Sequence, residues 1–134
     1  MPNAFVHIEL NTDDVAKAKK FYSSVFDWKL QDVPAMGYTM LDVGKGVGGG
    51  MQKNPMPAGP NHWLAYVEVA DVKKTVAKAR AAGANVFVDY KDIPGMGALG
   101  IFSDPSGAVL GVWQPAPKPP RKAAPKAAAK KKKR

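Results

Sequence analysis

Apolar and polar residues alternate in the segment FVHIEL, which begins at residue 5, and a helical pattern of apolar residues follows it. Side chains two positions apart on a strand share a face. Phe5, His7 and Glu9 are therefore predicted on one face of a strand, with apolar residues on the other. The apolar face is expected to pack under the helix, which leaves the mixed face toward a groove or cavity.

The same pattern returns from Asn61, in the segment NHWLAYVEVADVKKTVAKARAAG. Asp14 and Asp71 precede the two helical runs, 57 residues apart, and a carboxylate at that position caps the first turn of a helix. Each helix presents one apolar stripe. The mixed face of the second strand is predicted to hold His62, Leu64, Tyr66 and Glu68.

Each helix is followed by three further stretches of strand character. Residues 52–61 (QKNPMPAGPN) contain Pro, Gly and Asn and are predicted to link two halves. Gly83 is expected to end the second helix in a left-handed conformation. The order of strand, helix and three strands in each half predicts an α+β fold. The predicted later strands are 28–32, 38–43, one within GKGVGGGMQ, 85–90, 98–103 and 108–114.

Composition indicates one domain followed by a basic tail. The 134 residues are 46% hydrophobic, which is enough for a core, and no cysteine is present for disulfide or thiol chemistry. The formal net charge is +9, yet residues 115–134 hold nine basic residues and no acid. The remaining eleven basic residues are balanced by the eleven acidic ones. The predicted domain is therefore neutral.

Several linked segments together resemble the vicinal oxygen chelate superfamily, the glyoxalase, bleomycin resistance and dioxygenase group. They are HIELNTDD, AKKFYSSVFDWKL, the Gly-Gly-Gly-Met run, HWLAYVEVADV and DPSGAVLGVWQP. The resemblance implies two βαβββ modules that form a curved mixed sheet around a cavity. It places the domain at residues 1–116, with modules at about 4–52 and 61–116, and the tail at 117–134. It also implies a homodimer.

In the metal-using members of that superfamily, the first and last strands of each half together supply four ligands to a divalent ion. His7 matches the first of these positions. Leu64, Gly111 and Gly49 or a neighbour stand at the other three, which therefore lack a ligand atom. The expectation is that no metal is bound. The alternative is an irregular site for zinc, iron, nickel or manganese. Its ligands would be His7, Glu9, His62 and Glu68.

Two functions remain open from the sequence. The first is metal-free binding of a small organic ligand in the cavity between the modules. The second is an enzyme of the lyase, isomerase or dioxygenase type acting on a small oxygenated metabolite, with His7 and Glu9 as catalytic candidates. Whether the chain is an enzyme stays undecided. The predicted ligand-binding residues are His7, Glu9, Tyr38, Met40, Met51, Leu64, Tyr66 and Trp113.

The basic tail contains no aromatic or β-branched residue and is predicted to be disordered. It is expected either to bind nucleic acid without sequence preference, through phosphate contacts, or to act as a solubilising extension. No long apolar run or leader-like start is present, so a cytoplasmic protein that does not enter a membrane is expected. The predicted nucleic-acid contacts are Lys118, Arg121, Lys122, Lys126, Lys130, Lys131, Lys132, Lys133 and Arg134.

Overall fold

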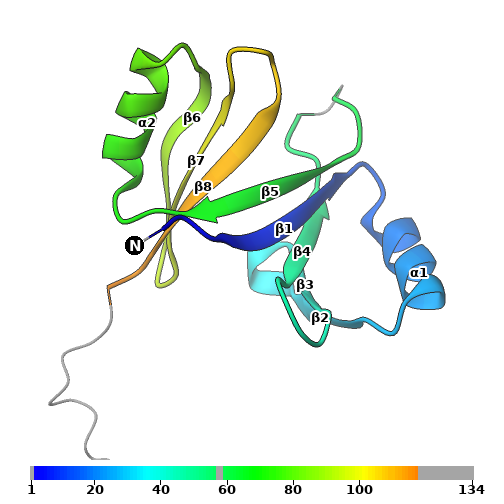
Figure 1. Ribbon diagram of the computed structural model, residues 1–134. Coiled ribbons are helices and arrows are strands. Elements are labelled where there is room, and N and C mark those ends of the chain that lie inside the picture. Colours follow the sequence, from blue (N-terminus) through cyan, green and yellow to red (C-terminus); the bar gives the residue numbers. More distant parts are fainter. Residues whose placement is uncertain (1, 57–58, 118–134) are drawn as a thin grey trace, which may run out of the picture.

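The computed structural model describes residues 2–56 and 59–117, so the predicted tail contacts from Lys118 onward lie outside the described residues. Two βαβββ halves are present, as the sequence predicted (Figure 1). In order, the elements are β1 (Phe5–Thr12), α1 (Val15–Val25), β2 (Lys29–Val33), a short 3₁₀ helix (Pro34–Met36), β3 (Tyr38–Asp42), β4 (Gly49–Lys53), β5 (His62–Glu68), α2 (Val72–Ala81), β6 (Asn85–Ile93), β7 (Gly97–Ser103) and β8 (Val109–Pro115).

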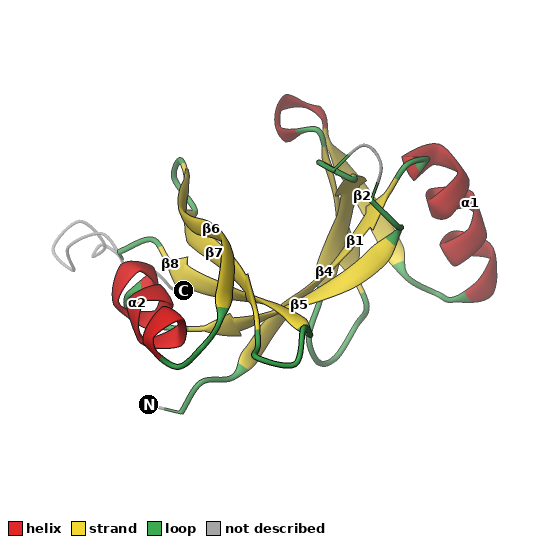
Figure 2. Ribbon diagram, turned by 90° about the horizontal axis from the view of Figure 1, so that it is seen from above, coloured by secondary structure: helices red, strands yellow, loops and turns green. Residues whose placement is uncertain are grey.

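All eight strands belong to one sheet in the order β2-β3-β4-β1-β5-β8-β7-β6. The first and fourth strands of each half pair in parallel, β1 with β4 and β5 with β8, and the halves join through the antiparallel pair β1–β5. The sheet curves into a trough, with α1 and α2 outside its two walls (Figure 2). In the described part of the chain, neither α-helix lies on the concave side.

Both helices begin where the capping aspartates predict. The Asp14 carboxylate accepts a hydrogen bond from the Lys17 amide at 3.0 Å, and Asp71 accepts one from the Lys74 amide at the same distance. Gly83 follows α2 with a φ of 104°, the left-handed conformation expected of a glycine after a helix. These local signals therefore fix the start of both helices and the end of α2.

The hydrophobic core consists of two clusters, one under each helix on the outer face of the sheet. Val72 and Val76 of α2 pack against Val69 and Val112. The cluster under α1 is formed by buried sheet residues and partly buried residues around them, and no residue of α1 itself is buried. Its members are Leu10, Leu41, Met51, Val15, Ala18, Tyr22, Trp28, Leu30 and Val43.

Strand alternation places the residues between these core positions on the concave face. Glu9 adjoins Leu10, and Gly111 adjoins Val112, so both face into the trough. Phe5 does not follow its predicted face. A register shift between Phe5 and His7 pairs Phe5 with Val67 but His7 with Tyr66, and adjacent residues of β5 lie on opposite faces. The bulge therefore turns Phe5 away from the face of His7 and Glu9.

Two boundaries differ from the predicted ones for physical reasons. The segment KDIPGMG was expected to be a loop, but β6 continues to Ile93 and only the residues up to Met96 turn back. Pairing with β7 extends the strand beyond its apolar run. The linker is also shorter than predicted, because Gln52 and Lys53 still belong to β4. In the described ranges, no helix combines the length and apolar character that a membrane span requires.

Candidate functional site

The concave face is organised around the carboxylate of Glu9, whose exposed fraction is only 7%. Its Oε2 accepts a hydrogen bond from the Tyr38 hydroxyl at 2.9 Å, and Oε1 accepts one from the Tyr66 hydroxyl at 3.2 Å. The amides of Asn11 and Gln52 donate to Oε1 at 3.3 and 3.4 Å. Four neutral donors thus take the place that water would have around this carboxylate.

The imidazole of His7 extends this network through the hydroxyl of Tyr38. His7 Nε2 lies 2.7 Å from the Tyr38 hydroxyl oxygen. The ring also stacks near Tyr38, with centroids 6.1 Å apart, and meets the edge of Tyr66 at 5.8 Å. Two tyrosine rings and two hydrogen-bonded steps therefore fix the position of His7 relative to Glu9.

Burial dominates the electrostatics of the cluster. It lowers the pKa of His7 below its ordinary value, and the neighbouring Glu9 carboxylate partly opposes this effect. Burial also raises the pKa of the Tyr38 and Tyr66 hydroxyls, and the charge of Glu9 and its hydrogen bonds raise it further. Both hydroxyls consequently remain protonated donors at physiological pH, and His7 favours its neutral form.

Two glycines provide the space that the tyrosines occupy. Gly50 pairs with Glu9 across β4 and β1, and Gly111 pairs with Tyr66 across β8 and β5, so they hold equivalent places in the two halves. A Cβ on Gly50 would lie 2.1 Å from the Tyr38 ring, and one on Gly111 would lie 2.5 Å from the Tyr66 ring. No side chain fits at either glycine unless the tyrosine moves.

This arrangement bears on the metal that the superfamily resemblance implies. The two glycine positions carry no ligand atom, and aromatic rings fill the space in which a ligand side chain would start. Within the described residues, no three His, Cys, Asp or Glu side chains come close enough together to hold an ion. The residues at these positions therefore do not fit a divalent metal.

The alternative metal ligands do not gather around His7 and Glu9. His62 lies further along β5, where its Nδ1 is 2.9 Å from the carbonyl oxygen of Pro60. Glu68 is exposed at the other end of the same strand, and its carbonyl accepts a hydrogen bond from the Asn3 amide. The structure thus brings together only His7 and Glu9 of these four predicted residues.

The predicted apolar residues separate into two groups. Leu64 stands opposite Glu9 in the β1–β5 register, and Met40 stands opposite Gly50. Trp113, opposite Glu68 in β8, continues the concave face beyond Gly111. Met51 differs, because it is fully buried in the core under α1, on the outer face of the sheet.

Sequence reasoning missed Asn11 and Gln52, although both belong to the network. Gln52 also donates to the Asn11 carbonyl oxygen at 2.9 Å, which orients both amides toward Glu9. Asn11 could have been found, because it lies two positions after Glu9 on the same strand and so shares its face. Gln52 had no comparable signal, since its segment was interpreted as the start of the linker.

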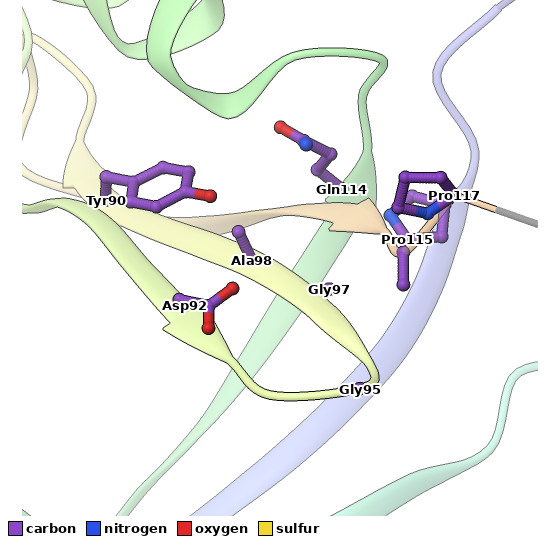
Figure 3. Close-up of a pocket in the computed structure, with 9 residues that line it drawn as sticks. Tyr90, Asp92, Gly95, Gly97, Ala98, Gln114, Pro115 and Pro117 are labelled. Atoms are coloured by element: carbon purple, nitrogen blue, oxygen red, sulfur yellow. The ribbon is translucent and has the colours of Figure 1, made fainter.

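A pocket of about 240 Å³ lies outside this network, beside the turn between β6 and β7 (Figure 3). Tyr90, Asp92 and Gln114 contribute its polar groups. The amide oxygen of Gln114 is already used, because it accepts a hydrogen bond from the Val72 amide at the start of α2. This pocket was not predicted from the sequence.

Comparison with known proteins identifies the family. The model of the Glyoxalase/Bleomycin resistance protein/Dioxygenase superfamily matches residues 4–112. The chain belongs to this superfamily. "Putative glyoxylase CFP32" of Mycobacterium tuberculosis is 39% identical over 112 residues, which cover 81% of this chain and 43% of the relative. "Anthracycline biosynthesis protein DauV" of Streptomyces sp. strain C5 is 30% identical over 133 residues, which cover 84% of this chain and 47% of the relative.

The chain thus spans less than half the length of these relatives.

Solved structures support the glyoxalase-like fold. A methylmalonyl-CoA epimerase from Mycobacterium tuberculosis superposes with a TM-score of 0.62 over 90% of this chain and 91% of its own, at 14% identity. Hypothetical protein BH1468 from Bacillus halodurans superposes with a TM-score of 0.64 over 90% of this chain and 99% of its own, at 12% identity. Identities this low carry the fold alone.

The network predicts a specific stability pattern. Tyr38→Phe and Tyr66→Phe each remove one donor from the buried Glu9 carboxylate and should lower the free energy of unfolding by about 1–3 kcal/mol. Urea unfolding measures the change. Tyr90→Phe is the control, because Tyr90 is 39% exposed and lies outside the network. Equal effects of all three substitutions would contradict the central role of Glu9.

Proposed function

We propose that this glyoxalase-like protein binds a small organic ligand on the concave face of its sheet without a catalytic metal. The observation that carries the proposal is the filling of the two glycine positions by the rings of Tyr38 and Tyr66. Their hydroxyls and two amides already satisfy the hydrogen-bonding capacity of Glu9. We therefore assign this carboxylate a structural role: it holds the surrounding side chains in place.

The chemistry of the concave face favours an aromatic or apolar ligand. Met40 and Trp113 are half-buried and supply apolar surface beside the polar cluster, whereas Leu64 faces the same side but is only 3% exposed. A ring system can stack on tryptophan. Binding sites of this kind combine apolar walls with a few placed polar groups. DauV is named for anthracycline biosynthesis, and anthracyclines are fused-ring aromatic compounds, which supports the same class of ligand.

Trp113 offers a direct measurement of this binding. Trp28 and Trp63 contact each other on the α1 side of the sheet, whereas Trp113 lies on the concave face. A panel of aromatic metabolites should contain compounds that raise the melting temperature and quench tryptophan fluorescence. The quenching should disappear in Trp113→Phe and persist in Trp63→Phe.

The same samples test the absence of metal. Elemental analysis of protein purified without chelators should find far less than one zinc, iron, nickel or manganese per chain. A stoichiometric metal that is lost in His7→Ala would overturn the proposal and favour the enzyme with an irregular site.

In the fluorescence experiment, quenching that persists in Trp113→Phe would show that the ligand binds elsewhere than on the concave face.

We also propose that two copies of the chain form a homodimer through α1. Phe21, Val25, Phe26 and Trp63 expose 41–56% of their surface there, and ring contacts through Tyr22 connect the three aromatic side chains. Contiguous exposed apolar side chains of this size are typical of contact surfaces. A second copy would also bring the assembly near the length of the curated relatives.

Light scattering at tens of micromolar should therefore give twice the 14.3 kDa mass of the chain. Phe21→Lys should shift the equilibrium to the monomer, because it places a charge in the apolar contact. Phe87→Lys is a matched control, since Phe87 in β6 is 57% exposed and Phe21 is 56% exposed. A monomeric wild-type protein, or dissociation by Phe87→Lys alone, would reject this interface.

The tail proposal rests on sequence alone, because residues 118–134 lie outside the described residues. All nine tail cations fall in this segment, and the domain before it is neutral. We propose that the tail binds nucleic acid through phosphate contacts, without sequence preference. The absence of cysteine suits a reducing compartment such as the cytoplasm, where nucleic acid is accessible.

The test is a fluorescence titration with a random DNA duplex at low and moderate salt. A chain that ends at Pro117 is the comparison, because β8 runs to Pro115 and the Ala116 amide still donates to Met96. Loss of the nine cations should abolish binding, and the full chain should bind more weakly as salt increases. Equal affinity of the two chains would identify the tail as an extension without this role.

A further inference from the structure

The hydrogen-bond network fixes which nitrogen of His7 carries the proton. Tyr38 has a single hydroxyl proton, which it donates to Oε2 of Glu9 at 2.9 Å. Its oxygen must therefore accept at the 2.7 Å contact with His7 Nε2. Nε2 is consequently the protonated nitrogen of the neutral ring, and Nδ1 carries the lone pair.

Among the described residues, Nδ1 of His7 is unpaired, and it is not buried. It has no hydrogen-bond partner within residues 2–56 and 59–117. Every fully buried side-chain nitrogen or oxygen in those residues does have a partner, so Nδ1 must reach the surface of the site. The cluster thus presents an exposed acceptor at His7, backed by the chain His7–Tyr38–Glu9.

The tyrosine hydroxyl protons and the Gln52 amide protons around it already have acceptors. Both tyrosine hydroxyls donate to Glu9, and Gln52 donates to Glu9 and Asn11. A ligand that approaches His7 therefore meets an acceptor rather than a donor. Protonation of Nδ1 would turn the His7 ring into a cation. Its Nε2 proton would still point toward the Tyr38 oxygen, and the Tyr38 hydroxyl would still donate to Glu9.

We propose that His7 Nδ1 accepts a hydrogen bond from a hydroxyl group on an aromatic or enolic ligand. This inference rests on the proposed function, because it assigns the chemical group recognised within the concave site. Glu9 and Tyr38 act as positioning residues: they hold the imidazole in one tautomer and one orientation. An ether or an unsubstituted ring offers no proton to Nδ1 and should bind less well.

The tautomer can be measured directly in the free protein by ¹⁵N NMR of the histidine side chains. The chain has only two histidines, and they should differ. His62 Nδ1 faces the Pro60 carbonyl, which only accepts, so neutral His62 carries its proton on Nδ1. Spectra recorded well above pH 6.5, the ordinary histidine pKa, should therefore show His7 and His62 as opposite tautomers. Tyr38→Phe should leave His7 as a mixture of tautomers.

Ligand recognition is tested with 1-naphthol and 1-methoxynaphthalene, which share a ring system but differ in the hydroxyl proton. The wild-type protein should bind 1-naphthol at least tenfold more tightly, as measured by Trp113 quenching. His7→Phe should abolish this preference, and His62→Phe should retain it. Melting temperatures of both variants confirm that they are folded.

The outcomes separate the two levels of the proposal. Binding of neither naphthalene compound would overturn the proposed aromatic site and this inference with it. Equal affinity for both compounds would overturn the inference and leave the aromatic site in place. A His7 ring protonated on Nδ1 in the free protein would also overturn the inference, because no acceptor would then face the ligand.

Discussion

Burial of the Glu9 carboxylate is the constraint on which the concave face depends. A carboxylate removed from water costs several kcal/mol unless donors replace its hydration. Here the replacement comes from neutral groups: the phenols of Tyr38 and Tyr66 and the amides of Asn11 and Gln52. The four donors lie on four strands: Asn11 on β1, Tyr38 on β3, Gln52 on β4 and Tyr66 on β5. Glu9 is therefore satisfied only when these strands pair in the correct register.

The fold could be predicted because its signals are local and repeated. The alternating strand before Asp14 and the matching one before Asp71 gave the two halves, and the aspartates gave the helix starts. The site was predicted only in part. Alternation placed His7 and Glu9 together, but a bulge that no residue pattern announced moved Phe5 away. Met51 was assigned to the site by its residue type, although its parity along β4 places it in the core.

The hydrogen bonds themselves could not be predicted, because they join residues that are far apart in the chain. Tyr38 reaches Glu9 across 29 positions and Tyr66 reaches it across 57. Which partner each hydroxyl finds depends on the parallel pairing that sets Gly50 beside Glu9 and Gly111 beside Tyr66. In the sequence, these glycines indicated only that ligand atoms were missing. In the structure, they explain why phenols stand in the same space.

The pairing of β1 with β5 gives the cluster a further property. Glu9 and Tyr66 occupy equivalent positions in the two repeats, yet one is an acceptor and the other a donor, and their hydrogen bond crosses the seam between the halves. A first half that folded alone would keep three donors to Glu9 but lose the fourth, and a second half alone would leave the Tyr66 hydroxyl without its acceptor. Docking of the two repeats is therefore coupled to desolvation of the carboxylate, which favours all-or-none folding over stepwise assembly of independently stable modules.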